Sequence, residues 1–206
     1  MQPWLTHTLE RIEQASLSRT PWPTPHLRIA DAFPADFYAE MLRQLPTYDR
    51  CIVTEKPWRH FFFRDAAAND PFWRQVFDGL CGPEMVAALA RKFAVAGASA
   101  DICLMRDEPG NVLGPHTDMP PKTLTGLFYL PETDAHADYG TSLFVSRSGL
   151  QCDGSRDHEF SADFQRVDKV RYLPNTGFFF AKTLESWHAA ERTKVPRSLI
   201  NIEINP

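Results

Sequence analysis

The second half of the chain, residues 99–205, is a series of short strand-like segments separated by turn residues, and this pattern constrains the fold most strongly. The segments cover residues 101–106, 123–130, 142–146, 166–173, 178–182 and 198–205. Turn residues lie between them at Pro109-Gly110, Gly140, Gly149, Gly154 and Pro174-Asn175. Repeated short strands with such breaks favour a β-sandwich or barrel.

The first half has a helical pattern. Apolar residues recur at helical spacing in the first 17 residues, and a proline-rich break follows at 21–25. Further helices are predicted at 34–45, from Asp70-Pro71 onward and at 83–93, with short strands at 27–30 and 58–63. A length of 206 residues fits one domain, 1–206, with a helical N-terminal portion (1–98) and a β core (99–206).

Composition narrows the class of partner. The net charge is -4 and no Lys/Arg cluster occurs, which disfavours nucleic acid and leaves a small molecule or a protein side chain as the default substrate. No run approaches the roughly 18 apolar residues of a membrane span, and no signal peptide is indicated. Four scattered cysteines without a C-x-x-C pair indicate free thiols in a reducing cytoplasm. Nothing in the sequence indicates the oligomeric state.

One short motif carries metal-binding chemistry. His116 and Asp118 stand two residues apart, and in an extended segment such residues point to the same side. A third ligand must come from elsewhere, and His188 is the best candidate. Two histidines and one carboxylate on one face of ferrous iron leave three positions open, which a bidentate keto acid and dioxygen require.

Arg197 opens the last strand-like segment, nine residues after His188. A dicarboxylate co-substrate needs a counter-charge, and the planar fork of arginine can bind a carboxylate through two hydrogen bonds. Alternation places Arg197 and Asn201 on a face directed into a pocket, so Asn201 is a candidate ligand contact. The opposite face is mostly apolar and is expected to pack on the N-terminal helices.

These features resemble the prolyl-hydroxylase-like branch of the Fe(II)/2-oxoglutarate-dependent oxygenases. The family motif is H-x-D, a distal His, and an Arg or Lys on the last core strand. The matching pieces occur in the family's order at Pro109-Gly110, His116-Thr117-Asp118, 127–130, Gly140-Thr141, 174–177, Trp187-His188 and Arg197.

The resemblance implies an α+β fold in which a double-stranded β-helix, or jelly roll, is supported by N-terminal helices. It implies Fe(II), 2-oxoglutarate and O2 as reactants, with His116, Asp118 and His188 as metal ligands and hydroxylation as the default outcome. Tyr129 matches a tyrosine that donates a hydrogen bond to the distal carboxylate of the co-substrate. Thr125 and Leu127 share its face by alternation and are also candidates for the co-substrate pocket.

Some positions leave alternatives open. Arg106 either approaches the keto acid or the substrate, or is an exposed charge at a strand end. Leu199 stands where the family sometimes has Ser or Thr, so Tyr129 would have to supply that hydroxyl group. Asp118 replaces the small residue of halogenating relatives, which makes halogenation unexpected. Two other classes remain open: a cupin-like metalloprotein that needs no keto acid, and a non-catalytic jelly-roll binding module.

Overall fold

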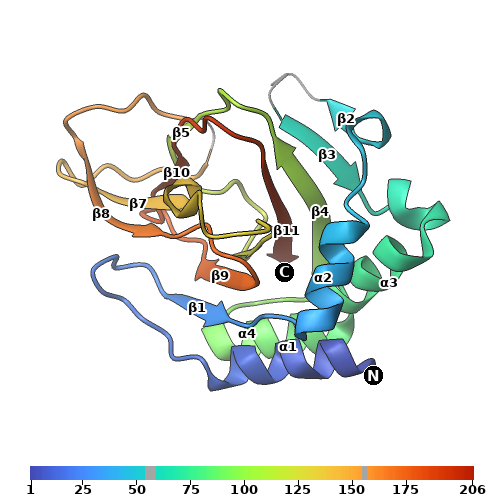
Figure 1. Ribbon diagram of the computed structural model, residues 1–206. Helices are drawn as coiled ribbons and strands as arrows, with labels where there is room; N and C mark the ends of the chain where they lie inside the picture. The colour runs from blue at the N-terminus through green and yellow to red at the C-terminus, as the bar shows by residue number, and fades with distance from the viewer. Residues whose placement is uncertain (54–58, 155–156) are drawn as a thin grey trace.

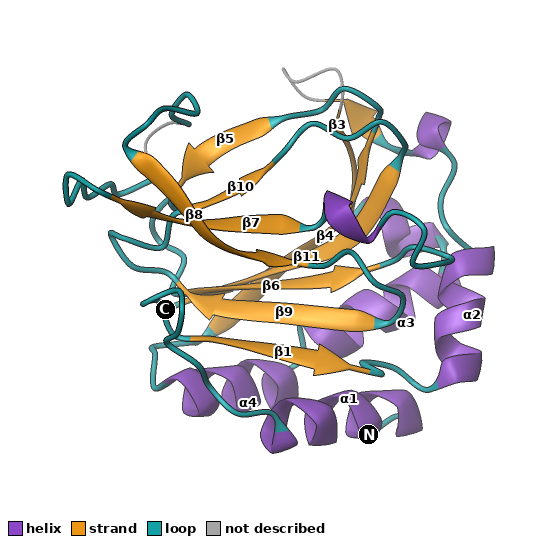
Figure 2. Cartoon of the chain, turned by 60° about the vertical axis from the view of Figure 1, so that its left-hand side comes forward, coloured by secondary structure: helices purple, strands orange, loops and turns teal. Residues whose placement is uncertain are grey.

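Two antiparallel sheets face each other in the computed structural model, which describes residues 1–53, 59–154 and 157–206. Figure 2 shows the two layers edge-on, with the smaller sheet above the larger one. The major sheet has the order β1 (His26–Ala30), β9 (Thr176–Ala181), β6 (Leu124–Tyr129), β11 (Arg197–Asn205), β4 (Ser99–Asp107), β3 (Arg59–Phe63) and β2 (Ile52–Val53). The minor sheet has the order β5 (Leu113–His116), β10 (His188–Ala190), β7 (Thr141–Ser146) and β8 (Phe164–Val170).

The helices cover the outer face of the major sheet and one of its ends. They are α1 (Pro3–Gln14), α2 (Ala35–Arg43), α3 (Pro71–Leu80) and α4 (Pro83–Phe93), with short 3-10 turns η1 (Tyr48–Arg50), η2 (Ala66–Asn69) and η3 (Ala137–Tyr139). Figure 1 shows α1 and α4 side by side beneath the sheet, and α2 and α3 at its right-hand end. As predicted, Asp70 caps α3: its carboxylate accepts a hydrogen bond from the amide of Trp73 at 3.1 Å.

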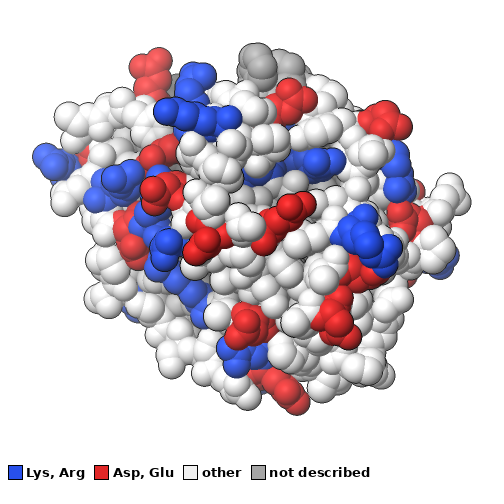
Figure 3. All heavy atoms as spheres, viewed as in Figure 1, with Lys and Arg blue, Asp and Glu red and all other residues white. Residues whose placement is uncertain are grey.

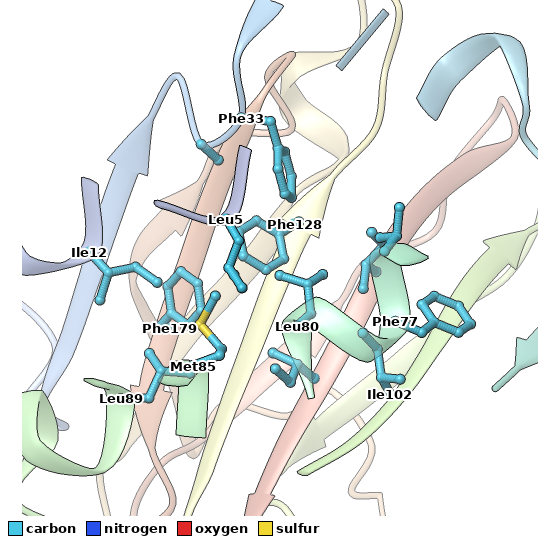
Figure 4. Close-up of a cluster of buried hydrophobic side chains, with 14 of the residues drawn as sticks. Leu5, Ile12, Phe33, Phe77, Leu80, Met85, Leu89, Ile102, Phe128 and Phe179 are labelled. Carbon is cyan, nitrogen blue, oxygen red and sulfur yellow. The ribbon is translucent and has the colours of Figure 1, made fainter. Parts of the chain in front are cut away.

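The main hydrophobic core lies between these helices and the outer face of the major sheet. Ile200, Ile202 and Ile204 of β11 are fully buried there, whereas Arg197 and Asn201 have the opposite parity. Figure 4 shows Leu5, Met85 and Leu89 of the helices against Phe128 and Phe179 of the sheet. The predicted α+β architecture, a jelly-roll core with supporting helices, is confirmed, and so is the two-faced character of the last strand.

Phe128 is expected to be a major contributor to stability. It is fully buried, its ring centroid lies 4.9 Å from that of Phe33, and it meets Phe179 edge-on at 5.2 Å. Phe128→Ala should lower the free energy of unfolding by about 3–5 kcal/mol, because it removes a large apolar side chain and leaves a cavity. Urea denaturation would measure this, with exposed Phe160→Ala as a control expected to change stability little. A loss below about 1 kcal/mol for Phe128→Ala would contradict this description of the core.

The N-terminal portion supplies strands as well as helices. β1 forms one edge of the major sheet, and β3 and β2 extend its other side next to β4. The predicted strand at 58–63 is observed from Arg59 onward, and Trp58 lies outside the described residues. No helix within the described ranges is long and apolar enough to cross a membrane. The important consequence is that β3 brings Arg59 and Phe61 alongside the inner face of the jelly roll.

Candidate metal centre and adjoining cavity

His116, Asp118 and His188 come together at one end of the minor sheet. Each offers a ligand atom, and these atoms all lie within 4.8 Å of one another. His116 ends β5 and pairs across the strands with His188, the first residue of β10, so the two ring centroids are 4.2 Å apart. Asp118 follows two residues later on the same side. The structure thus brings together the three residues predicted from H-x-D and the distal histidine.

Both imidazole rings are oriented by backbone carbonyls. His116 Nδ1 lies 2.9 Å from the carbonyl oxygen of Gly114, and His188 Nδ1 lies 2.9 Å from that of Ser186. Since a carbonyl oxygen can only accept, each Nδ1 is the donor, which leaves Nε2 as the ring atom that a neutral imidazole can offer to a metal. Metal-binding histidines usually have this second hydrogen bond, which fixes the tautomer and the ring orientation.

The protonation states also suit a divalent cation. Burial and the neighbouring His188 lower the pKa of His116 to about 4, so this imidazole is neutral near pH 7. Burial acts to raise the pKa of Asp118, but His188 and Lys122 outweigh it and the net pKa is below its ordinary value. A neutral imidazole and an ionised carboxylate are the forms that bind metal. This donor set fits ferrous iron, as predicted.

Asp118 is held by Thr125 of β6 and by Lys122 of the segment that precedes this strand. The Thr125 hydroxyl donates to one carboxylate oxygen at 2.7 Å, and the Lys122 ammonium lies 3.5 Å from the other. Lys122 also pairs with Glu203 at 2.6 Å, and the Asn201 amide donates to Glu203 at 2.7 Å. Thr125 therefore contacts a candidate metal ligand, and Asn201 acts through Glu203 and Lys122.

Thr125→Val should weaken metal binding while leaving the fold intact. The change keeps the shape of the side chain but removes the hydrogen bond to Asp118, and loss of such an outer contact typically lowers metal affinity about 10- to 100-fold. Titration of Mn²⁺ by calorimetry would measure the loss. Thr176→Val is a matched control, because the Thr176 hydroxyl donates to the carbonyl of Leu173 instead. Equal Mn²⁺ affinity in Thr125→Val and wild type would show that this contact does not orient Asp118.

The loop after β7 packs closely against the H-x-D segment. Thr117, which points away from its two neighbours, donates from its hydroxyl to the carbonyl of Cys152 at 2.8 Å. Gly154 has φ of +88°, and a Cβ atom there would lie 2.2 Å from the carbonyl oxygen of Asp118. A larger residue would therefore collide with the backbone that carries the carboxylate ligand.

A cavity of about 610 Å³ opens beside the candidate ligands His116 and Asp118, and its volume is within the range of small-molecule sites. It reaches from His116 and Asp118 across the inner face of β11 and β4 to β3. Phe61 and Phe63 of β3 border it with stacked rings, 5.5 Å between centroids and 6° between planes. Asn201 lines the cavity, as its parity predicted.

Arg197, the residue predicted to bind the co-substrate carboxylate, is buried and already paired. Its side chain is 3% exposed, and it donates from Nε and Nη2 to Asp107 at 3.1 and 2.6 Å. Its Nη1 donates to the carbonyl of Tyr139 at 2.9 Å. Arg197 is therefore on the predicted inner face, but its guanidinium is already paired with a carboxylate, and it does not border the cavity.

The other predicted pocket residues divide into two groups. Tyr129 and Leu127 lie on the inner face, where Tyr129 is fully buried and its hydroxyl lies 2.7 Å from that of Thr141. Arg106 is not brought to the site. It lies on the opposite face of β4 from Asp107, with its guanidinium 4.1 Å above the ring of Tyr48 and Nη1 donating to Pro46.

Sequence reasoning missed the charged residues around this site. Lys122 pairs with both Asp118 and Glu203, and Asp107 pairs with Arg59 and Arg197. A signal for Asp107 and Glu203 was present, because both continue the inward parity of a strand whose other face is apolar. Arg59 and Lys122 offered no comparable signal, since their positions depend on strand register and on loop conformation.

Comparison with known proteins relates this architecture to one group of enzymes. The sequence matches no protein-family model and no curated protein. Among solved structures, a Pseudomonas putida prolyl-4-hydroxylase is similar with a TM-score of 0.61 and 13% identity, over 98% of each chain. The epimerase SnoN from nogalamycin biosynthesis, described as non-heme and α-ketoglutarate dependent, has a TM-score of 0.60 and 17% identity over 98% of this chain and 83% of that one.

A third similar structure was solved with a metal ion and 2-oxoglutarate bound. HygX from Streptomyces hygroscopicus, solved with nickel, 2-oxoglutarate and hygromycin B, has a TM-score of 0.58 and 13% identity over 89% of this chain and 83% of that one. At identities of 13–17% the likeness shows a shared fold. The chain thus has the fold of the 2-oxoglutarate oxygenases, and a His-Asp-His set lies beside its cavity.

Proposed function

We propose that this chain is an Fe(II)- and 2-oxoglutarate-dependent dioxygenase that hydroxylates a small molecule or a protein side chain. One observation carries the proposal: His116, Asp118 and His188 converge beside a cavity, with both Nδ1 atoms bound to backbone carbonyls so that both Nε2 atoms are free. When bound, iron and 2-oxoglutarate would supply an oxidation that consumes O2, releases succinate and CO2, and hydroxylates the substrate.

The protein's own part in this reaction is to bind, orient and exclude water. Thr125 and Lys122 hold the Asp118 carboxylate in place, and the carbonyls of Gly114 and Ser186 fix the two imidazoles. Phe61, Phe63, Met105 and Leu113 give the cavity apolar walls that limit the access of water.

Arg197 is the residue that we assign to the distal carboxylate of the keto acid. Its position on the inner face of β11 and its permanent positive charge support this role. Three of its five N–H groups are used by Asp107 and Tyr139, which leaves two for a ligand. Burial raises the pKa of the Tyr129 hydroxyl, and the positive charge of Arg197 acts against this rise, so the two side chains are near enough to share a carboxylate ligand.

The substrate is proposed to be a metabolite or an exposed protein side chain in the cytoplasm, rather than nucleic acid. The net charge of -4 supports this choice. On the face drawn in Figure 3, basic and acidic side chains of the described residues are interspersed rather than gathered into a basic stripe.

Succinate formation from 2-oxoglutarate is the test, because it reports the co-substrate whatever happens to the substrate. Purified protein would be incubated with Fe(II), ascorbate and 2-oxoglutarate, with and without pooled metabolites and peptides. We expect iron-dependent succinate that rises with one pool. Oxygen uptake without any need for 2-oxoglutarate would instead indicate a cupin-like enzyme. Absence of both metal and 2-oxoglutarate binding would indicate a binding module.

A further inference from the structure

We propose that Arg59 is a carboxylate receptor on the β3 side of the cavity. It would bind with the side of its guanidinium that faces the cavity, while Asp107 holds the other side. The inference deepens the proposed function and rests on it, because it assigns a ligand group to the same cavity. It adds a residue from the N-terminal portion, outside the H-x-D, distal His and Arg197 set.

Strand register creates a row of three charged residues across the major sheet. Arg59 of β3 and Arg197 of β11 both lie directly opposite Asp107 of β4. Arg59 donates from Nε to Asp107 Oδ1 at 2.5 Å and from Nη2 to Oδ2 at 3.1 Å. The same carboxylate accepts from Arg197, so one aspartate lies between two guanidiniums.

The row of Arg59, Asp107 and Arg197 is buried and carries a net positive charge. Burial acts to raise the pKa of Asp107, but Arg197 and Arg59 outweigh it and the pKa is lowered, so the carboxylate is ionised. Two arginines and one aspartate leave one uncompensated positive charge. Asp107 is 0% exposed and Arg59 is 9% exposed, and a charge in such surroundings gains strongly from an anionic partner.

Arg59 is the member of the row that forms part of the cavity wall. It borders the cavity together with His116 and Asp118, whereas Arg197 does not. Arg197 uses Nη1 on the carbonyl of Tyr139, but within residues 1–53, 59–154 and 157–206 nothing accepts from Nη1 of Arg59. Asp107 holds the guanidinium rigidly, so its free edge is pre-organised for a planar carboxylate.

The other cations at the cavity are either exposed to solvent or paired with more than one carboxylate. Arg64 pairs with Asp78 at 2.6 Å and its side chain is 55% exposed. Lys122 pairs with Glu203 and lies beside Asp118. Arg59 is therefore the lining cation, within the described part of the chain, that is buried and shares its carboxylate partner with a second arginine. The ligand's carboxylate is either the distal group of the keto acid or a carboxylate of the substrate.

Binding measurements on Mn²⁺-loaded protein test the proposal without turnover. Wild type, Arg59→Met and Arg59→Lys would be titrated with 2-oxoglutarate, and then, in the presence of saturating 2-oxoglutarate, with 3-phenylpropanoate. That probe joins a carboxylate to a ring that suits the Phe61–Phe63 pair. Arg91→Met is the control, because Arg91 of α4 pairs with Glu13 and does not border the cavity.

Arg59→Met should lower the affinity for the ligand whose carboxylate Arg59 binds by about 10- to 100-fold, as expected for loss of hydrogen bonds to a charged group. Arg59→Lys should be intermediate, because it keeps the charge but loses the fork. Weaker 2-oxoglutarate binding would assign the site to the keto acid. Unchanged 2-oxoglutarate binding with Arg59-dependent binding of 3-phenylpropanoate would assign it to the substrate.

Unchanged 2-oxoglutarate affinity, with no Arg59-dependent binding of 3-phenylpropanoate, would overturn the proposal. Thermal unfolding and Mn²⁺ affinity of each variant would report on the fold. If Arg59→Met does not fold, the comparison of Arg59→Lys with wild type decides by the same criteria. Failure of the proposed function would look different, since wild type itself would then bind neither Mn²⁺ nor 2-oxoglutarate.

Discussion

Replacing His188 by alanine should lower Mn²⁺ affinity by more than about 100-fold and abolish 2-oxoglutarate consumption with Fe(II). The change removes one of three donors, and even partners outside the ligand set typically contribute 10- to 100-fold. His116→Ala should have the same effect, because the two imidazoles lie side by side. Calorimetry with Mn²⁺ and a succinate assay would measure both losses.

The fold should survive these substitutions. His116 and His188 lie at the end of the minor sheet, away from the helix-covered core. His136→Ala is a suitable control, because His136 lies next to the 3-10 turn η3 and stacks on Tyr139. Full 2-oxoglutarate consumption by both His116→Ala and His188→Ala would contradict the metal assignment.

Replacing Arg197 by methionine should have two separable effects. The free energy of unfolding should fall by roughly 2–4 kcal/mol, because the buried Asp107 loses two hydrogen bonds and one of its two cations. The 2-oxoglutarate concentration required for half-maximal binding should rise by about 10-fold or more, because a counter-charge of the distal carboxylate is lost.

Urea denaturation and titration of the Mn²⁺-loaded variant would measure these effects independently. Arg197→Lys keeps the charge and should recover part of the affinity, although it cannot reproduce both contacts with Asp107. An unchanged 2-oxoglutarate requirement in folded Arg197→Met would remove Arg197 from its assigned role. In that case the role of the Arg197 side chain would be to pair with Asp107 and stabilise the fold.

Part of the candidate ligand set was predictable because the H-x-D signal is local. His116 and Asp118 share a side through simple alternation, and His188 was found by its family context. The two faces of the last strand followed from the same alternation. Thr125 was also correctly placed on the inner face, yet its observed hydrogen bond is to Asp118, a contact that depends on the loop between them.

The Arg59–Asp107–Arg197 row could not be predicted, because it depends on pairing between strands far apart in the sequence. Asp107 lies 48 residues from Arg59 and 90 residues from Arg197. Arg106 illustrates the same limit, since a shift of one residue along β4 places a side chain on the opposite face of the sheet. Arg59 borders the cavity because the N-terminal portion adds β3 to the major sheet next to β4.

The most direct test is titration of 2-oxoglutarate into wild-type protein with and without Mn²⁺. Manganese occupies the site that we assign to iron without supporting turnover, so the experiment isolates binding. We expect 2-oxoglutarate to bind only when Mn²⁺ is present, and this binding to be lost in His188→Ala. Binding of equal strength without metal, or no binding to folded protein that holds Mn²⁺, would contradict the assignment of this cavity to a metal-chelated keto acid.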